Sequence, residues 1–305
     1  MAPPFLKTPE EYKKLVDSVD ADYLGCHADC DGVVYFGPKV VEGVKEVLDM
    51  FRKAGKKVLF VTNNATKSRR KLKENLDKLG LGASEEECFG SAYASAIYLS
   101  EVLKFPKDKK VYVNGEEGLE EELDACGIKH CGGSDPEDRD FKPPINWDAF
   151  KPDDDVEAVL CGFDSYINYQ KLGKAMTYLR NPKCKLILTN TDPTFPTHGE
   201  LFPGSGSLSL PIVNASKREP LVIGKPNKSM MDAILTHHKV DPSKALMVGD
   251  NLATDIEFGL NSNIRTLLVM GGVTKHEQVY GENPSKVVPD MVINSLGDLA
   301  VLARQ

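Results

Sequence analysis

The chain has 305 residues, of which 41% are hydrophobic and 27% are charged, and its formal net charge is -7. This length and ordinary globular composition fit a soluble enzyme with a large core and two domains, and they exclude little else. The acidic balance argues against nucleic-acid binding as the main function, although it allows a local cationic site for a small anion. The seven cysteines are scattered without paired spacing, which favours reduced thiols inside the cell.

The sequence also argues against a membrane protein or a secreted one. No run approaches the roughly 18 apolar residues of a membrane helix. The first residues, MAPPFL, have neither a basic start nor an apolar signal core. We therefore expect a soluble intracellular protein, cytoplasmic or, if a transit peptide has been removed, in the plastid stroma.

Strands and helices alternate along the chain in a pattern typical of an α/β fold. Short apolar runs with β-branched residues predict strands, and apolar residues at helical spacing predict helices. In chain order we expect a strand at 23–28, a helix between Pro38 and Gly55, a strand at 58–61, a helix at 68–79, a linker at 105–110, a strand at 111–113, alternating elements at 116–125, 156–161, 168–180 and 185–188, a loop rich in proline and glycine at 192–206, strands at 221–223, at 245–248 and near 266, and a terminal helix near 296–304.

The middle part of this alternation predicts an inserted domain. It begins after the linker and separates the strand at 58–61 from the strand at 221–223. We therefore expect a core domain made of residues 1–104 and 218–305, and a smaller α/β domain made of residues 105–217.

Polar side chains follow four of the predicted strands. Open α/β sheets bind ligands at the carboxyl ends of their strands, so these side chains are expected to share one site. They are Asp29 and Asp31 of the run Asp29-Cys30-Asp31-Gly32, Thr62, Asn63 and Asn64 after the second strand, Lys225 after 221–223, and Asp250, Asn251 and Asp255 after 245–248. An acidic pair alone is more often a solvated turn, whereas four such coincidences indicate a functional site.

Together these groups suit phosphoryl transfer through a covalent intermediate. We expect Asp29 to be the nucleophile and Asp31 the general acid and base. Clustered carboxylates and a phosphate repel one another, so Mg²⁺ is expected, with Asp250 as a further carboxylate ligand. We expect Thr62, Asn63 and Asn64 to donate hydrogen bonds to the phosphate, and Lys225 to neutralise the charge of the nucleophile and the phosphoryl group. Asp255 and Asn251 are expected to contact the residues that bind the metal and the phosphate.

Four segments resemble the motifs of the haloacid-dehalogenase-type phosphatases, and the resemblance spans almost the whole chain. The inserted domain resembles the α/β cap of the branch that contains phosphoglycolate phosphatase, 4-nitrophenyl phosphatase and pyridoxal phosphatase, and Thr189-Asn190-Thr191-Asp192 with Pro203-Gly204-Ser205-Gly206-Ser207 is similar to the specificity loop of that branch. The four motif segments are Asp29-Cys30-Asp31-Gly32, Val61-Thr62-Asn63-Asn64, Gly224-Lys225-Pro226, and Gly249-Asp250 with Asp255.

The resemblance implies a Rossmann-like core, a parallel sheet with helices on both faces, and an inserted cap of the C2 type. It implies Mg²⁺ held by Asp29, by the main-chain carbonyl of Asp31 and by Asp250, and a homodimer formed through the cap. The expected substrate is a small phosphorylated metabolite.

Within this branch the sequence favours 2-phosphoglycolate as the substrate. Pyridoxal phosphatases resemble one another in a histidine of the specificity loop, whereas here Asp192-Pro193-Thr194 leads to Phe195. The alternatives are a broad 4-nitrophenyl phosphatase, a pyridoxal phosphate phosphatase, and a regulatory protein that binds phosphate without turnover. The presence of every expected catalytic side chain argues against the last.

Two further segments carry structural expectations. The first strand contains Gly25 and His27, and these small or polar residues predict a strand before Asp29 that is shifted, bulged or less tightly packed than usual. Cys126, His130 and Cys131 do not match the spacing of a zinc motif, so we expect a surface turn there.

Overall fold

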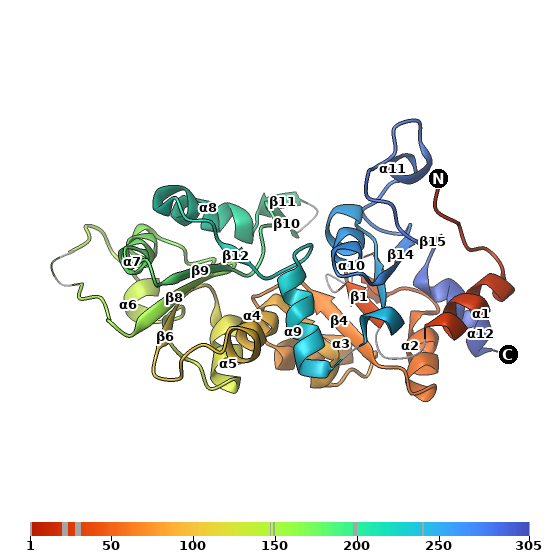
Figure 1. Cartoon of the computed structure of the whole chain (residues 1–305), viewed down its shortest axis with the longest axis horizontal. Coiled ribbons are helices and arrows are strands. Elements are labelled where there is room, and N and C mark those ends of the chain that lie inside the picture. The colour runs from red at the N-terminus through yellow and green to blue at the C-terminus, as the bar shows by residue number, and fades with distance from the viewer. Residues whose placement is uncertain are drawn as a thin grey trace. The chain divides into compact units, whose positions relative to one another are not determined.

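The chain folds into two compact units, each built around its own sheet (Figure 1). The first unit comprises Met1–Thr62, Arg69–Phe89 and Lys225–Gln305, and the second comprises Asn63–Ser68 and Gly90–Gly224. The computed structural model describes residues 2–19, 24–27, 32–146, 148, 150–197, 200–239 and 241–304.

The first unit contains a six-stranded sheet with the order β15-β14-β13-β1-β4-β5. The pairs β15–β14, β14–β13, β13–β1 and β1–β4 are parallel. The bounds are α1 Pro9–Ser18, β1 Leu24–His27, β2 Tyr35–Phe36, β3 Lys39–Val40, α2 Val44–Lys53, β4 Val58–Thr62, α3 Arg69–Lys78, a 3₁₀ turn Glu85–Glu87, β5 Cys88–Gly90, α9 Lys228–His238, a 3₁₀ turn Pro242–Lys244, β13 Leu246–Gly249, a π-helical turn Leu252–Ile256, α10 Glu257–Asn261, β14 Arg265–Val269, α11 His276–Tyr280, β15 Met291–Ile293, a 3₁₀ turn Leu296–Leu299 and α12 Ala300–Ala303.

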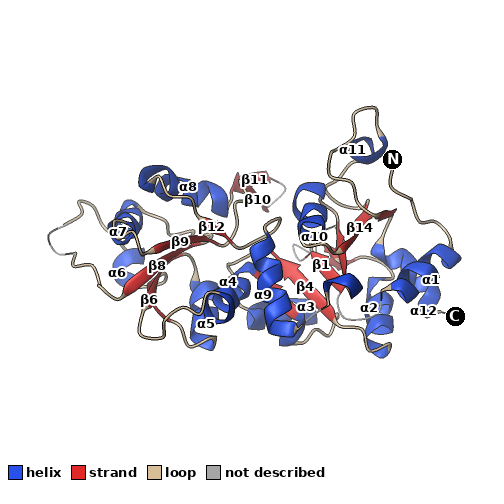
Figure 2. Cartoon of the chain, viewed as in Figure 1, coloured by secondary structure: helices blue, strands red, loops and turns tan. Residues whose placement is uncertain are grey.

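Both faces of this sheet are covered, as the resemblance implied (Figure 2). Successive side chains of a strand point to opposite faces. Accordingly, Leu267 of β14 packs into the larger core cluster, and its neighbour Leu268 packs into a second cluster with Leu252 and Val292. Burial on both faces explains why the strands are apolar runs without alternation.

Helix α2 shows how the local sequence produces this packing. Its buried residues Val44, Val47, Leu48 and Phe51 recur at spacings of three and four, so they line the single face that contacts the sheet. The helix ends at Lys53, and Gly55, two residues later, has a φ of 71°, a conformation that favours glycine.

Strand β1 is regular over the residues that the structure describes. It pairs in unbroken parallel register with β4, from Leu24 opposite Val58 to His27 opposite Val61, and with β13 on its other side. The expected shift or bulge is therefore wrong for Leu24–His27. Backbone hydrogen bonds on both sides hold the central strand straight whatever its side chains are.

The second unit contains a five-stranded parallel sheet with the order β12-β9-β8-β6-β7. Its core is formed by residues such as Val159, Ala175 and Leu186. The bounds are α4 Ser91–Ile97, a π-helical turn Tyr98–Val102, β6 Lys110–Asn114, α5 Glu117–Ala125, β7 Lys129–Gly132, α6 Pro136–Arg139, β8 Val156–Cys161, α7 Tyr169–Leu179, β9 Lys185–Leu188, β10 Thr194–Thr197, β11 Glu200–Pro203, α8 Ser205–Ser216 and β12 Leu221–Val222.

Three expectations for this unit are corrected. The strand at Leu221–Val222 was expected in the core domain, but it pairs with Ile187 and Leu188 of β9 in the second sheet. The segment 192–206, expected to be a loop, contains the β10–β11 hairpin and the start of α8. Short strands take their order from pairing partners distant in sequence, which a local apolar pattern does not encode.

The third correction concerns Cys126, His130 and Cys131. His130 and Cys131 belong to strand β7, and only Cys126 lies at the turn before it. The His130 ring nitrogen Nε2 lies 3.1 Å from a carboxylate oxygen of Asp124. Burial raises the pKa of the Cys131 thiol to about 11, so this thiol is protonated at neutral pH.

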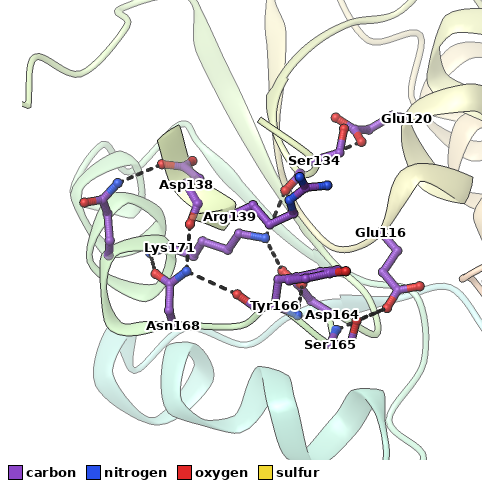
Figure 3. Close-up of polar contacts among 12 residues, drawn as sticks. Glu116, Glu120, Ser134, Asp138, Arg139, Asp164, Ser165, Tyr166, Asn168 and Lys171 are labelled. Carbon is purple, nitrogen blue, oxygen red and sulfur yellow. Dashed lines mark hydrogen bonds and ion pairs between the residues drawn. The ribbon is translucent and has the colours of Figure 1, made fainter. Parts of the chain in front are cut away.

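A buried polar network joins helix α7 to the loops around it (Figure 3). Lys171 and Asp164, each with a side chain only 1% exposed, form an ion pair of 2.7 Å. The Lys171 ammonium also donates to the carbonyl of Gly133, and Asn168 donates to the carbonyl of Asp138. Each buried charge thus has partners of opposite polarity, which is the condition for its burial.

The chain passes between the two compact units at residues 62/63, 68/69, 89/90 and 224/225. The expected domain boundaries, at 104/105 and 217/218, stay a prediction about the functional core and its insertion. Among the described residues, no helix combines the length and the apolar character needed to span a membrane.

Candidate active site

The carboxylate pair Asp29 and Asp31 lies outside the described residues, but Gly32, which follows it, is described. Gly32 is buried and has a φ of 99°, and its N–H donates to the carbonyl of Tyr35 at 3.0 Å. A Cβ atom on Gly32 would lie 2.5 Å from Oδ2 of Asp250. Both the backbone conformation and the lack of space therefore require glycine here, and the residue after Asp31 lies against Asp250.

Asp250 follows directly after β13 and is 3% exposed. Its Oδ2 accepts a hydrogen bond of 2.8 Å from the N–H of Val273, and its main-chain carbonyl accepts one from Thr274. A Cβ atom on Gly272 would lie 1.9 Å from the same carboxylate oxygen. Two close glycine backbones, Gly32 and Gly272, and a charge-assisted hydrogen bond thus fix the direction of this carboxylate.

Lys225 and Asp255 form an ion pair of 3.1 Å, and both side chains are completely buried. The Lys225 ammonium also donates to the main-chain carbonyl of Val61, at the carboxyl end of β4, at 3.1 Å. The second oxygen of Asp255 accepts a hydrogen bond from the N–H of Asn251. A lone buried charge is costly, so the carboxylate of Asp255 offsets the cost of burying the Lys225 ammonium, and the side chain lies beside the strand that ends at Thr62.

Asp255 and Asn251 hold the segment after Asp250 in place. A Cβ atom on Gly249 would lie 2.1 Å from the Cβ of Asp255, so the strand end and the carboxylate are in close contact. The side chain of Asn251 accepts a hydrogen bond from the N–H of Ala253 and caps the turn that carries Asp255. Both residues shape the segment after Asp250.

Thr62, Asn63 and Asn64 follow one another, but their side chains serve different contacts. Thr62 ends β4 and is buried. The amide of Asn63 donates to both carboxylate oxygens of Asp192, at 3.0 and 3.3 Å. The side-chain oxygen of Asn64 accepts two hydrogen bonds from Thr66, each 2.8 Å, and so closes a local turn.

Sequence reasoning missed the residues that hold these groups in place. Gly272 and Val273 orient Asp250, and the dipeptide Gly271-Gly272 after β14 was an unused turn signal. No local signal could have linked Asn63 to Asp192, because 129 residues separate them.

The donor atoms present fit a small, hard cation. Mg²⁺ prefers oxygen ligands and is usually bound by one or two carboxylates with substrate and water. Asp250 supplies such a carboxylate, held beside the backbone of Gly32, and Asp29 and Asp31 are the expected remaining ligands. Within the described ranges, no group of three or more histidine, cysteine, aspartate or glutamate side chains is arranged to hold a metal.

Comparison with known proteins agrees with this arrangement. Two family models match the chain, a haloacid dehalogenase-like hydrolase over residues 26–129 and an HAD-hydrolase-like model over residues 222–299. The 4-nitrophenylphosphatase of Schizosaccharomyces pombe is 44% identical over 98% of this chain and 99% of its own length. The phosphoglycolate phosphatase 1A, chloroplastic, of Arabidopsis thaliana is 43% identical over 95% of this chain and 78% of its own.

A solved structure extends the comparison to three dimensions. The p-nitrophenyl phosphatase from Archaeoglobus fulgidus matches with a TM-score of 0.74 and 31% identity, over 92% of this chain and 98% of its own. The chain therefore belongs to the phosphatases of the haloacid dehalogenase-like hydrolase family.

Proposed function

We propose that this protein is a Mg²⁺-dependent phosphomonoester hydrolase and that its preferred substrate is 2-phosphoglycolate. The observation that carries the proposal is the completely buried Lys225, paired with Asp255 at the end of β4, together with Asp250 held against the backbone of Gly32. A fixed cation and a fixed carboxylate at the carboxyl ends of β4 and β13, the two parallel strands that flank β1, suit a phosphate ester with its metal.

The reaction proceeds in two displacements at phosphorus. A carboxylate oxygen of Asp29 attacks, the bond from phosphorus to the ester oxygen breaks, and Asp31 gives a proton to the departing alkoxide. Asp31 then takes a proton from water, the water oxygen bonds to phosphorus, and the bond to Asp29 breaks to release phosphate. Lys225 supplies positive charge close to the transferred group, and Thr62 donates to one of its oxygens. Bound Mg²⁺ supplies neutralisation of the carboxylate and phosphate charges.

The choice of substrate rests on the relatives and on one residue. Phosphoglycolate phosphatase 1A of Arabidopsis is among the similar proteins, and so is a 4-nitrophenylphosphatase. The resemblance to pyridoxal phosphatases would require an Asp-Pro-aromatic run followed by histidine, whereas Asp192-Pro193-Thr194 leads to Phe195. The broad 4-nitrophenyl phosphatase and the pyridoxal phosphate phosphatase remain the competing assignments.

The test combines one variant with a substrate series. Asp29→Asn should abolish hydrolysis of 4-nitrophenyl phosphate, whereas Asp140→Asn, at an exposed position, should leave it unchanged. In the unmodified protein, kcat/KM should be highest for 2-phosphoglycolate when compared with pyridoxal 5'-phosphate and glycerol phosphate. Activity of Asp29→Asn near the normal level would refute the mechanism. A preference for pyridoxal 5'-phosphate would refute the substrate, and a protein without turnover of any ester would be the silent binding protein.

A further inference from the structure

The segment that follows Thr62 belongs structurally to the second unit. Residues Asn63–Ser68 continue from β4 of the first unit, yet their contacts place them with Gly90–Gly224. The Ser68 hydroxyl donates to the carboxylate of Glu121 on α5. A Cβ atom on Gly118 of the same helix would lie 2.6 Å from the backbone of Thr66, so helix and segment are in direct contact.

Asn63 is held by hydrogen bonds from both its side chain and its main chain. It is 4% exposed, and its amide donates to the carboxylate of Asp192. Its main-chain carbonyl accepts from the amide of Asn190 at 2.8 Å and from the hydroxyl of Ser91 at 2.5 Å. A hydrogen bond to an ionised carboxylate is about twice as strong as a neutral one, and burial shields it from water. The residue next to Thr62 is thus fixed to the loop Thr189–Asp192.

Gly224, the residue before Lys225, is also held by the loop Thr189–Asp192. The N–H of Gly224 donates to the carbonyl of Thr189 at 2.7 Å. A Cβ atom on Gly224 would lie 2.6 Å from both the side-chain oxygen of Asn63 and the carbonyl of Thr189. Thr62 therefore precedes Asn63 in the chain, Lys225 follows Gly224, and Asn63 and Gly224 lie against each other.

We propose that Asn63 and Asp192 are a pair of positioning residues that couple the loop Thr189–Asp192 to the phosphate site. The loop sets the position of Thr62 through Asn63 and that of Lys225 through Gly224. This inference rests on the proposed phosphatase function and extends it, because the loop resembles the segment that selects substrates. It also assigns Asn63 to the loop and not to the phosphate, unlike the expectation from sequence.

A residue swap tests the pair, with inorganic phosphate as the probe. Asn63→Asp places two carboxylates together, and it should raise the inhibition constant of phosphate, measured with 4-nitrophenyl phosphate, about tenfold, the equivalent of one strong hydrogen bond. The double variant Asn63→Asp/Asp192→Asn restores one amide and one carboxylate with their roles exchanged. It should return the constant to within about threefold of the unmodified protein. Asp154→Asn, an exposed carboxylate in the same unit, is the matched control and should change nothing.

The outcomes separate the possible roles of Asn63. If Asn63 bound phosphate directly, the swap would stay as impaired as Asn63→Asp, because an acid would still face the anion, and the inference would fail. It would also fail if Asn63→Asp left the constant unchanged. Failure of the proposed function is distinct, because the unmodified protein would then not hydrolyse 4-nitrophenyl phosphate at all.

Discussion

Replacing Lys225 by methionine removes the charge from the buried pair with Asp255 and nearly preserves the volume of the side chain. Both partners are completely buried and 3.1 Å apart, so the variant leaves a carboxylate without its cation. Removing one partner of a buried pair costs about 3–5 kcal/mol of the free energy of unfolding. Asp255→Asn should cost a similar amount, because it removes the carboxylate that lies 3.1 Å from the buried ammonium of Lys225.

The double variant Lys225→Met/Asp255→Asn distinguishes charge pairing from simple damage. It removes both charges of this pair, so its free energy of unfolding should fall less than that of either single variant. Its hydrolysis of 4-nitrophenyl phosphate should still be lost, since the charge of Lys225 is absent. Stability and activity therefore separate in one protein.

Urea unfolding monitored by circular dichroism gives the stabilities, and the rate of nitrophenol release gives the activity. The pair Lys228–Asp232 is the matched control, at 3.7 Å on the exposed surface of α9. Exposed pairs at this helical spacing contribute about 0.5 kcal/mol or less, so Lys228→Met should have little effect on stability or activity. Equal costs for the two lysines, or a double variant as unstable as the sum of the single ones, would refute the reasoning.

Two other predictions concern different parts of the chain. Gly272→Ala places a methyl group where Oδ2 of Asp250 lies, so the carboxylate should be displaced. The Mg²⁺ concentration for half-maximal activity should then rise about 10–100-fold, the usual effect of disturbing the residues that support a metal ligand. An unchanged Mg²⁺ requirement would contradict the role of Asp250. Burial raises the pKa of Tyr178 to about 12, above the unfolded value of about 10. The contribution of this pKa shift to the free energy of unfolding is therefore complete below pH 10 and is lost toward pH 12. Between these pH values the urea midpoint should fall less in Tyr178→Phe than in the unmodified protein. Equal falls in the two proteins would exclude a contribution from Tyr178.

The sequence by itself determined the elements of the core and the positions of several functional groups along it. Val58–Val61 and Ala245–Val248 are continuous apolar runs, and the structure has β4 and β13 there, with Thr62 and Asp250 at their ends. The same holds for α2, whose buried face follows from residue spacing alone. These features depend on neighbours within a few residues, so local patterns encode them.

Tertiary structure alone decided which distant residues meet. The strand at Leu221–Val222 belongs to the second sheet because its backbone pairs with Ile187 and Leu188 of β9. The side-chain amide of Asn63 donates to the carboxylate of Asp192, 129 residues later in the chain. Gly32 and Gly272 must be glycine because their backbones lie against the carboxylate of Asp250. Such contacts depend on packing and hydrogen bonding between segments that the sequence keeps apart, and for this reason no local pattern records them.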